Sequence, residues 1–233
     1  MKLSLAPNPP LPDSCLFDVE VLDLGLIDYE ESFCLQREII RDILSGNRQN
    51  VLLLCEHHPV ITMGRLADKR NILRPEEEIK AGGITIKHIN RGGDATLHLP
   101  GQLVAYPLFD LRVLGRDIGR FLRNLEKAAI LLLQDYGLKA YSMPNITGVW
   151  VNGKKIASIG IALSHWITYH GMGLNINCNL GLFSLIRPCG QDIMMTSMAQ
   201  ENSGVILDMS EIKSRIADKF YEVFNLKGEV VNG

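Results

Sequence analysis

A thiol, an amine and an imidazole lie in one stretch of the chain, between residues 152 and 190. They belong to Cys189 in RPCG, Lys155 in KIASIG and His170 in TYHG. Strand-like sequence and glycines separate them, so a sheet could fold Lys155 back against Cys189. Such a pair could carry out nucleophilic catalysis, with the thiol as nucleophile and the amine as its base or counter-ion.

Cys189 has two interpretations from its local sequence. Pro188 and Gly190 place the thiol in a tight turn rather than inside a regular element. It could be a small buried hydrophobic residue, since free cysteine is among the most buried residue types. It could instead be a nucleophile, which needs a neighbour that lowers the thiol pKa from about 8.5.

Lys155 also has two interpretations. A lysine after the Asn152-Gly153 turn is often a solvated strand end. However, side chains alternate across a strand, and Lys154 can take the exposed face. Lys155 would then point inward, where a desolvated amine beside a thiol can share a proton with it.

A glycine-rich loop, Arg91 to Gln102, offers many backbone N–H donors together with Arg91 and His98. Such loops bind carboxylate, phosphate or carbonyl oxygen. The loop lacks the spacing of a nucleotide-binding fingerprint. His57 and His58 have no third ligand at a suitable spacing, so we expect no metal site.

Composition indicates a packed globular protein. The 233 residues are 46% hydrophobic and 21% charged, and the formal net charge of −2 gives no overall attraction to nucleic acid or anionic membranes. The five cysteines are an odd, scattered set. With no window of eighteen apolar residues and no signal-peptide core, we expect a cytoplasmic protein.

The hydrophobic pattern predicts an α+β fold in one catalytic domain, residues 15–233, after a flexible arm at residues 1–14. Helices are expected at 29–44, 117–137 and 208–224. Strands are expected at 16–24, 51–55, 84–90, 103–108, 146–151, 155–163 and 166–178, and a polar loop from Thr62 through Arg74. The Asn152-Gly153 turn predicts a hairpin, so the sheet should be mixed and largely antiparallel, with flanking helices.

The segment RGGDATLHLPGQLVAYPLFDL resembles the signature RGG-x-x-T-Y-H-G-P-G-Q-x-x-x-Y-P of the octanoyl-[acyl carrier protein]–protein octanoyltransferases, also called lipoate-protein ligase B. The resemblance continues through EHHPVITMGR, GVWVNGKKIASIGIAL, TYHGMGLNIN and RPCG, and covers about residues 20 to 224. It implies the fold of the biotinyl/lipoyl ligases. It also implies an acyltransferase with a Cys/Lys dyad that needs neither ATP nor metal.

The resemblance also implies a role for particular residues. Cys189 matches the acyl-thioester nucleophile, and Lys155 matches the partner that lowers its pKa and moves protons. The residues that match acyl-substrate contacts are Arg91, Gly92, Gly93, Asp94, Ala95, Thr96, Leu97, His98, Ser158, Ile159, Gly160, His170, Gly171, Met172 and Gly173.

Two positions depart from the family signature. Leu97 stands where the family has tyrosine, and Leu99 stands where it has glycine. If position 99 requires a positive φ, leucine is strained there and the loop takes another shape.

The implied partners are octanoyl-acyl carrier protein as donor and, as acceptors, lipoyl domains of 2-oxoacid dehydrogenase complexes and the glycine cleavage H protein. Both are expected to be acidic, so a basic patch could steer them. The candidate patches are Arg65, Lys69, Arg70 and Arg74, or Arg112, Arg116, Arg120 and Arg123.

Three alternatives remain open from the sequence. An ATP-using lipoate ligase on the same fold would not need Cys189. A non-catalytic protein could bind acyl groups or lipoyl domains if the changes at Leu97 and Leu99 abolish activity. A thioester hydrolase would release free octanoate.

Overall fold

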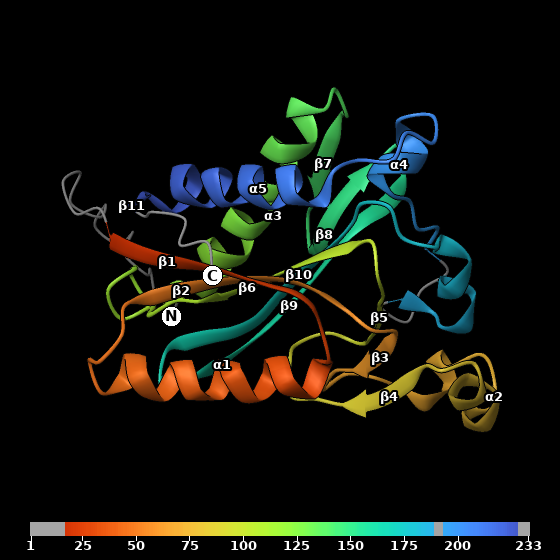
Figure 1. Cartoon of the computed structure of the whole chain (residues 1–233), viewed down its shortest axis with the longest axis horizontal. Coiled ribbons are helices and arrows are strands. Elements are labelled where there is room, and N and C mark those ends of the chain that lie inside the picture. The colour runs from red at the N-terminus through yellow and green to blue at the C-terminus, as the bar shows by residue number, and fades with distance from the viewer. Residues whose placement is uncertain (1–16, 189–192, 228–233) are drawn as a thin grey trace, which may run out of the picture.

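Eight strands form one mixed sheet in the computed structural model, which describes residues 17–188 and 193–227 (Figure 1). Their order across the sheet is β11-β1-β2-β6-β10-β9-β8-β7. The strands are β1 (Phe17–Ile27), β2 (Asn50–His57), β6 (Gln102–Leu108), β7 (Ala140–Met143), β8 (Ile146–Val151), β9 (Lys154–Ser164), β10 (Ile167–Asn175) and β11 (Leu226–Lys227). β1 pairs parallel with β2 and β11, and the other pairs are antiparallel. The expected mixed, largely antiparallel sheet is confirmed.

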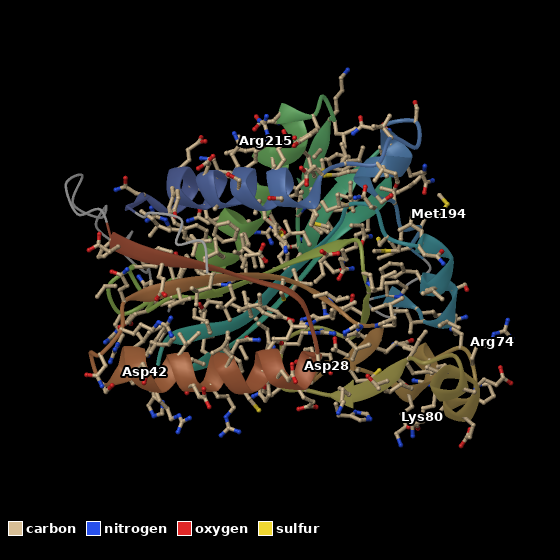
Figure 2. The ribbon with its side chains drawn as sticks, in the orientation of Figure 1. Asp28, Asp42, Arg74, Lys80, Met194 and Arg215 are labelled. Carbon is tan, nitrogen blue, oxygen red and sulfur yellow. The ribbon has the colours of Figure 1, made fainter. Side chains whose placement is uncertain are left out.

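Helices cover both faces of this sheet (Figure 1). α3 (Ile118–Asp135) and α5 (Met209–Phe224) pack on one face and bury the larger apolar cluster. α1 (Tyr29–Leu44) covers the other face and buries a second cluster with β2, β6 and β10. Asp28 and Asp42 mark the two ends of α1 in Figure 2. All three helices were expected from their apolar period, within two residues at each end.

Local sequence explains where two of these helices begin and end. Asp117 accepts a hydrogen bond from the Arg120 N–H at the start of α3, and Asp208 accepts one from the Ser210 N–H at the start of α5. Gly137 follows α3 with a φ of 75° and donates its N–H to the Gln134 carbonyl. Only glycine adopts this left-handed conformation at low cost.

A second, three-stranded sheet lies beside the large one, with strand order β4-β3-β5. It consists of β3 (Val60–Met63), β4 (Thr85–His88) and β5 (Ala95–His98), and α2 (Glu76–Ala81) packs against it (Figure 1). The sequence predicted loops at Thr62 and at 91–102, and both predictions were wrong for the residues in β3 and β5. Short strands paired to each other are stabilised by tertiary contacts that a polar, glycine-rich sequence does not reveal.

The remaining elements are short connections. They are the 3₁₀ turns η1 (Lys69–Asn71) and η2 (Leu180–Leu185) and the single-turn helix α4 (Met198–Glu201). The expected arm at residues 1–14 lies outside the described residues. Within the described part of the chain, no helix is long and apolar enough to cross a membrane.

Candidate active site

Lys155 is fully buried near the start of β9. The β8–β9 hairpin that carries it turns at Asn152 and Gly153, whose φ values of 50° and 75° fit the expected type I′ turn. The register shifts after this turn, because Trp150 pairs with Lys155 while the adjacent Val149 pairs with Ala157. A bulge of this kind re-aims side chains and is common beside active sites. The inward orientation expected for Lys155 is what the structure shows.

The Lys155 amine has polar and aromatic neighbours from β8. Its Nζ lies 3.4 Å from the Thr147 carbonyl oxygen and 5.2 Å from the centre of the Trp150 ring. The backbone of Lys155 pairs with the segment after residue 192, since its N–H bonds to the Met194 carbonyl and its carbonyl accepts from Thr196 N–H. Met194, labelled in Figure 2, is largely exposed to solvent.

A cavity opens along β9 and β10, starting three residues beyond Lys155. Its walls come from α1, β5, β6, β9, β10 and the segment that joins β4 to β5. The lining residues are Tyr29, Ile89, Arg91, Gly93, Asp94, Ala95, Thr96, His98, Tyr106, Ser158, Ile159, Gly160, His170, Gly171, Met172 and Gly173. Three separate stretches that the sequence singled out therefore meet around one cavity. Lys155 does not line it, and Ser158, the first lining residue on β9, lies about 10 Å further along the strand.

Arg91 brings a guanidinium into this cavity while being only 7% exposed. Its Nη2 donates to the carbonyl and the hydroxyl of Thr62 at 2.7 and 3.0 Å, and its Nη1 donates to the Gly92 carbonyl at 3.0 Å. Gly160 leaves room for it, because a Cβ there would lie 3.1 Å from the Arg91 Cδ and 2.7 Å from the Gly92 carbonyl oxygen. The cavity thus holds a fixed positive group that can attract a carbonyl oxygen.

His170 forms part of the cavity wall and is held from both ring nitrogens. Its Nε2 lies 3.1 Å from the Asn90 amide oxygen, and its Nδ1 lies 3.4 Å from the Tyr29 hydroxyl. The Phe33 ring stacks on it at 5.5 Å. An Nε2–H donor and an Nδ1 acceptor satisfy both contacts, so the neutral imidazole fits this site.

His98 is a second buried imidazole on the cavity wall. Its Nδ1 lies 2.7 Å from the Gln102 amide oxygen, which assigns the proton to Nδ1. Behind it, His57 donates from Nδ1 to the Ile27 carbonyl and accepts at Nε2 from the Tyr106 hydroxyl, both at 2.8 Å. His98 and Tyr106 thus line this side of the cavity, and Gln102 and His57 hold them by hydrogen bonds from outside it.

Burial lowers the pKa of both cavity histidines to about 3. For His98 the nearby His57 adds to the effect, and for His170 the Arg91 guanidinium does so. Burial lowers the pKa of His57 as well. The imidazoles are therefore neutral at physiological pH, which suits an uncharged, apolar ligand.

The stability of the protein should fall as the pH decreases from about 6.5 to about 3. An unfolded chain takes up a proton at each histidine below pH 6.5, whereas the folded chain keeps His98 and His170 neutral until about pH 3. Each of them should contribute a slope of about 1.4 kcal/mol per pH unit. Urea unfolding of the wild type and of His98→Gln between pH 4 and pH 6 measures this, and an unchanged slope in the variant would contradict it.

Two residues expected at the substrate lie elsewhere. Leu97 is fully buried in the apolar cluster of the small sheet and does not line the cavity. Gly92 also does not line it, and instead donates its N–H to the Ile161 carbonyl at 2.8 Å. The strand period explains Leu97, because its neighbours Thr96 and His98 point to the opposite side.

The strain expected at Leu99 does not arise. Leu99 is 2% exposed in the same apolar cluster and is not among the described residues with positive φ. Gly101 has the left-handed conformation instead, with a φ of 81°. Both leucines that depart from the family signature thus serve the core of the small sheet.

Sequence reasoning missed three cavity residues, namely Tyr29, Ile89 and Tyr106. Tyr29 is the first residue of α1 and Tyr106 lies in β6, so both looked like ordinary core positions. Their hydroxyls contact His170 and His57, and only the folded chain brings these pairs together. No local motif marked them.

Cys189 lies outside the described residues, as does Gly190. The described parts of the chain on either side of them, Arg187–Pro188 and Ile193–Met195, line a common surface depression with η2. In the part of the chain that the structure describes, no three His, Cys, Asp or Glu residues are grouped so that they could hold a metal ion.

Comparison with known proteins finds a family that matches most of the chain. Residues 28–221 match the model described as the lipoyl protein ligase A/B catalytic domain. An octanoyltransferase of Roseiflexus sp. (strain RS-1) is 45% identical, covering 91% of this chain and 89% of its own. An octanoyltransferase of Solibacter usitatus is 42% identical, covering 88% of this chain and 92% of its own.

The fold is also found in a solved lipoate-protein ligase A bound with ATP. The TM-score is 0.74 at 16% identity, and the match covers 94% of this chain and 90% of that one. At this identity, the likeness shows the shared fold alone.

Proposed function

Because the chain belongs to the lipoyl protein ligase A/B catalytic domain family, we propose that it transfers an octanoyl group from octanoyl-acyl carrier protein to a lipoyl-domain lysine. The chain is an octanoyltransferase by its similarity to proteins of that name over about nine-tenths of its length. The structural observation that carries the proposed mechanism is a fully buried Lys155 on β9, the strand that three residues later, from Ser158, lines a cavity with neutral histidines and apolar side chains.

In the first half of the proposed reaction, the Cys189 thiolate attacks the thioester carbonyl of the donor. The bond between the carbonyl carbon and the phosphopantetheine sulfur breaks, and that thiol leaves with a proton supplied through the Lys155 amine. Backbone N–H groups of a glycine-rich segment can supply the hydrogen-bond donors that the oxyanion needs. The product is an octanoyl thioester on Cys189.

In the second half, the ε-amine of a lipoyl-domain lysine attacks this thioester. A carbon–nitrogen bond forms, the bond to the Cys189 sulfur breaks, and Lys155 accepts the proton lost by the attacking amine. Conversion of a thioester to an amide is favourable, so the proposed reaction uses no ATP and no metal.

The cavity supports an acyl chain as the ligand. Ile89, Ala95, Ile159 and Met172 provide apolar surface, and the histidines in the wall remain uncharged. Burying apolar surface of a chain against such walls contributes about 0.8 kcal/mol per methylene. We therefore place the octanoyl chain here, with its thioester towards Lys155.

The first of the two predicted basic patches is the better candidate for docking an acidic donor or acceptor. Arg65 adjoins a cavity residue, because its backbone N–H bonds to the Arg91 carbonyl. In the first patch Arg70 pairs with Asp68, whereas in the second patch two arginines are paired, Arg112 with Asp110 and Arg123 with Glu126. Arg74, labelled in Figure 2, lies at the same end of the molecule as α2.

Exposed Cys34 is a free thiol and supports a cytoplasmic location.

The test is the intact mass of the purified protein after mixing with octanoyl-acyl carrier protein, without ATP. We expect a gain of one octanoyl group that is absent in Cys189→Ala and that moves to a lipoyl-domain lysine when this acceptor is added. Cys34→Ala is the matched control, because Cys34 is an exposed thiol on α1 and should leave the mass gain unchanged.

Each alternative has its own outcome in this experiment. Ligation that requires octanoate and ATP, and that persists in Cys189→Ala, would identify a ligase. Release of free octanoate without amide formation would identify a hydrolase. Tight binding of the donor without any mass change would identify a non-catalytic binder.

A further inference from the structure

One backbone peptide, between Thr147 and Gly148, lies between Lys155 and a buried carboxylate. Its carbonyl oxygen is 3.4 Å from the Lys155 Nζ, and its N–H donates to Glu126 Oε1 at 2.8 Å. Thr147 carries the carbonyl and Gly148 the N–H of the same planar group. The peptide therefore connects an acidic side chain of α3 to the amine on β9.

Glu126 is an unusual residue for its position. It is 1% exposed on the face of α3 that packs against the sheet, among leucines and alanines. Burying a carboxylate costs free energy unless the group is paired. Glu126 accepts a hydrogen bond from the Gly148 N–H and forms an ion pair with Arg123 at 2.7 Å. An apolar residue would fill this place without these requirements, so the carboxylate calls for an explanation beyond packing.

Space around Gly148 fixes this arrangement. Gly148 has a φ of 143°, and a Cβ on it would lie 2.7 Å from the Lys155 Cε and 3.2 Å from its Nζ. The end of the lysine side chain thus occupies the volume that any larger residue would need. The Thr147–Gly148 peptide cannot rotate without losing its bond to Glu126.

We propose that Glu126 is a positioning residue for Lys155, acting through the Thr147–Gly148 peptide. A carboxylate that accepts from a peptide N–H polarises the group and makes its carbonyl a stronger acceptor, since hydrogen bonds in a chain reinforce one another. The stronger carbonyl then holds the Lys155 amine in place. The groups that act electrostatically on Glu126 are Arg123 on the same helix and Lys155 across the peptide.

The electrostatics agree with this geometry. Burial raises the pKa of Glu126, while the Gly148 N–H, Arg123 and Lys155 act in the opposite direction. The carboxylate is therefore in electrostatic contact with the amine that the proposed function places at the reacting thioester. The inference rests on that proposed function, and it extends the site by one residue from α3.

Glu126→Gln is the test, because the amide oxygen can still accept from the Gly148 N–H while the negative charge is lost. We expect kcat for octanoyl transfer to fall about tenfold, as for one weakened charge-assisted hydrogen bond, with KM for the donor unchanged. The measurement is steady-state transfer to a lipoyl domain, with kcat and the KM for the donor determined separately.

Glu211→Gln is the matched control. It makes the same chemical change at an exposed position on α5, where Glu211 pairs with Arg215, and it should leave both kcat and KM unchanged. If Glu126→Gln lowers the melting temperature but keeps the wild-type kcat, Glu126 is only structural and the proposal is overturned.

A spectroscopic measurement separates this inference from the proposed function. In Glu126→Gln, the amide signal of Gly148 and the ε-methylene signal of Lys155 should both move in NMR spectra, whereas in Glu211→Gln neither should. These shifts need no turnover, so they hold even if the wild type fails to transfer octanoate. An unchanged Lys155 signal in a folded Glu126→Gln protein would contradict the proposal.

Discussion

Lys155→Met is expected to lower the rate of octanoyl transfer by about 10²- to 10⁴-fold, the usual contribution of a positioned acid–base group. Methionine has a similar length and no amine, so it fills the same volume between Trp150 and Gly148. Both halves of the proposed reaction should slow, since each moves a proton through this amine. Single-turnover kinetics of enzyme acylation and of transfer to the acceptor measure the two steps separately.

The fold should survive this substitution. Methionine keeps the packing of the fully buried Lys155 side chain, but the Thr147 carbonyl loses this hydrogen-bond donor. We therefore expect the free energy of unfolding to fall by about 1–3 kcal/mol, the usual cost of leaving one buried polar group unsatisfied. A loss of activity that merely followed a loss of folded protein would refute the catalytic assignment.

Lys154→Met is the matched control for this prediction. Lys154 is the adjacent residue, is partly exposed, and lies 3.3 Å from Glu201 rather than towards β8. A partly exposed ion pair contributes about 1 kcal/mol or less to stability, so little change is expected in either activity or unfolding. A comparable fall in rate for the two variants would mean that burial of Lys155 has no special role.

The larger elements of the fold could be predicted because their signals are local. The apolar period of residues 29–44 fixed α1, and the Asn152-Gly153 dipeptide identified the turn between β8 and β9. In both cases, residues close in sequence interact directly, and their preferences agree with the final structure. The inward direction of Lys155 also followed from simple strand alternation.

The small sheet and part of the cavity could not be predicted for the opposite reason. β3 and β5 pair across more than thirty residues, with Ile61 opposite Leu97, and the segment between them is polar and rich in glycine. Tyr29 and Tyr106 reach the cavity only because α1 packs across β6 and β10. Nothing near either tyrosine in sequence indicates a histidine partner.

The family signature was informative about residue identity but misleading about conformation at one position. A glycine in the signature suggested a positive φ at Leu99, whereas the chain turns at Gly101 and buries Leu99 beside Leu97. A sequence pattern does not show whether a glycine is needed for its backbone conformation or because a larger side chain would clash with its neighbours. At Gly171 the neighbouring atoms are the reason.

Gly171→Ala is expected to destabilise the protein by about 3 kcal/mol or more, among the largest effects of a single methyl group. A Cβ at this position in β10 would clash with the Ala105 carbonyl oxygen and would lie 2.8 Å from the Pro107 Cδ. Both contacts belong to β6, the neighbouring strand in the centre of the sheet, so relief requires the two strands to move apart. Denaturant unfolding measures the change.

Gly92→Ala provides the comparison, because a Cβ there would meet only the Ile161 carbonyl oxygen at an ordinary 3.6 Å and its φ is not in the left-handed range. Its unfolding free energy should stay within about 1 kcal/mol of wild type.

Gly171 also lines the cavity between His170 and Met172, so separation of β6 from β10 would widen the proposed acyl site. Gly171→Ala should therefore lose acylation by octanoyl-acyl carrier protein even at temperatures where it remains folded. If Gly171→Ala unfolds and is acylated like the wild type, β6 and β10 are not packed as closely as described.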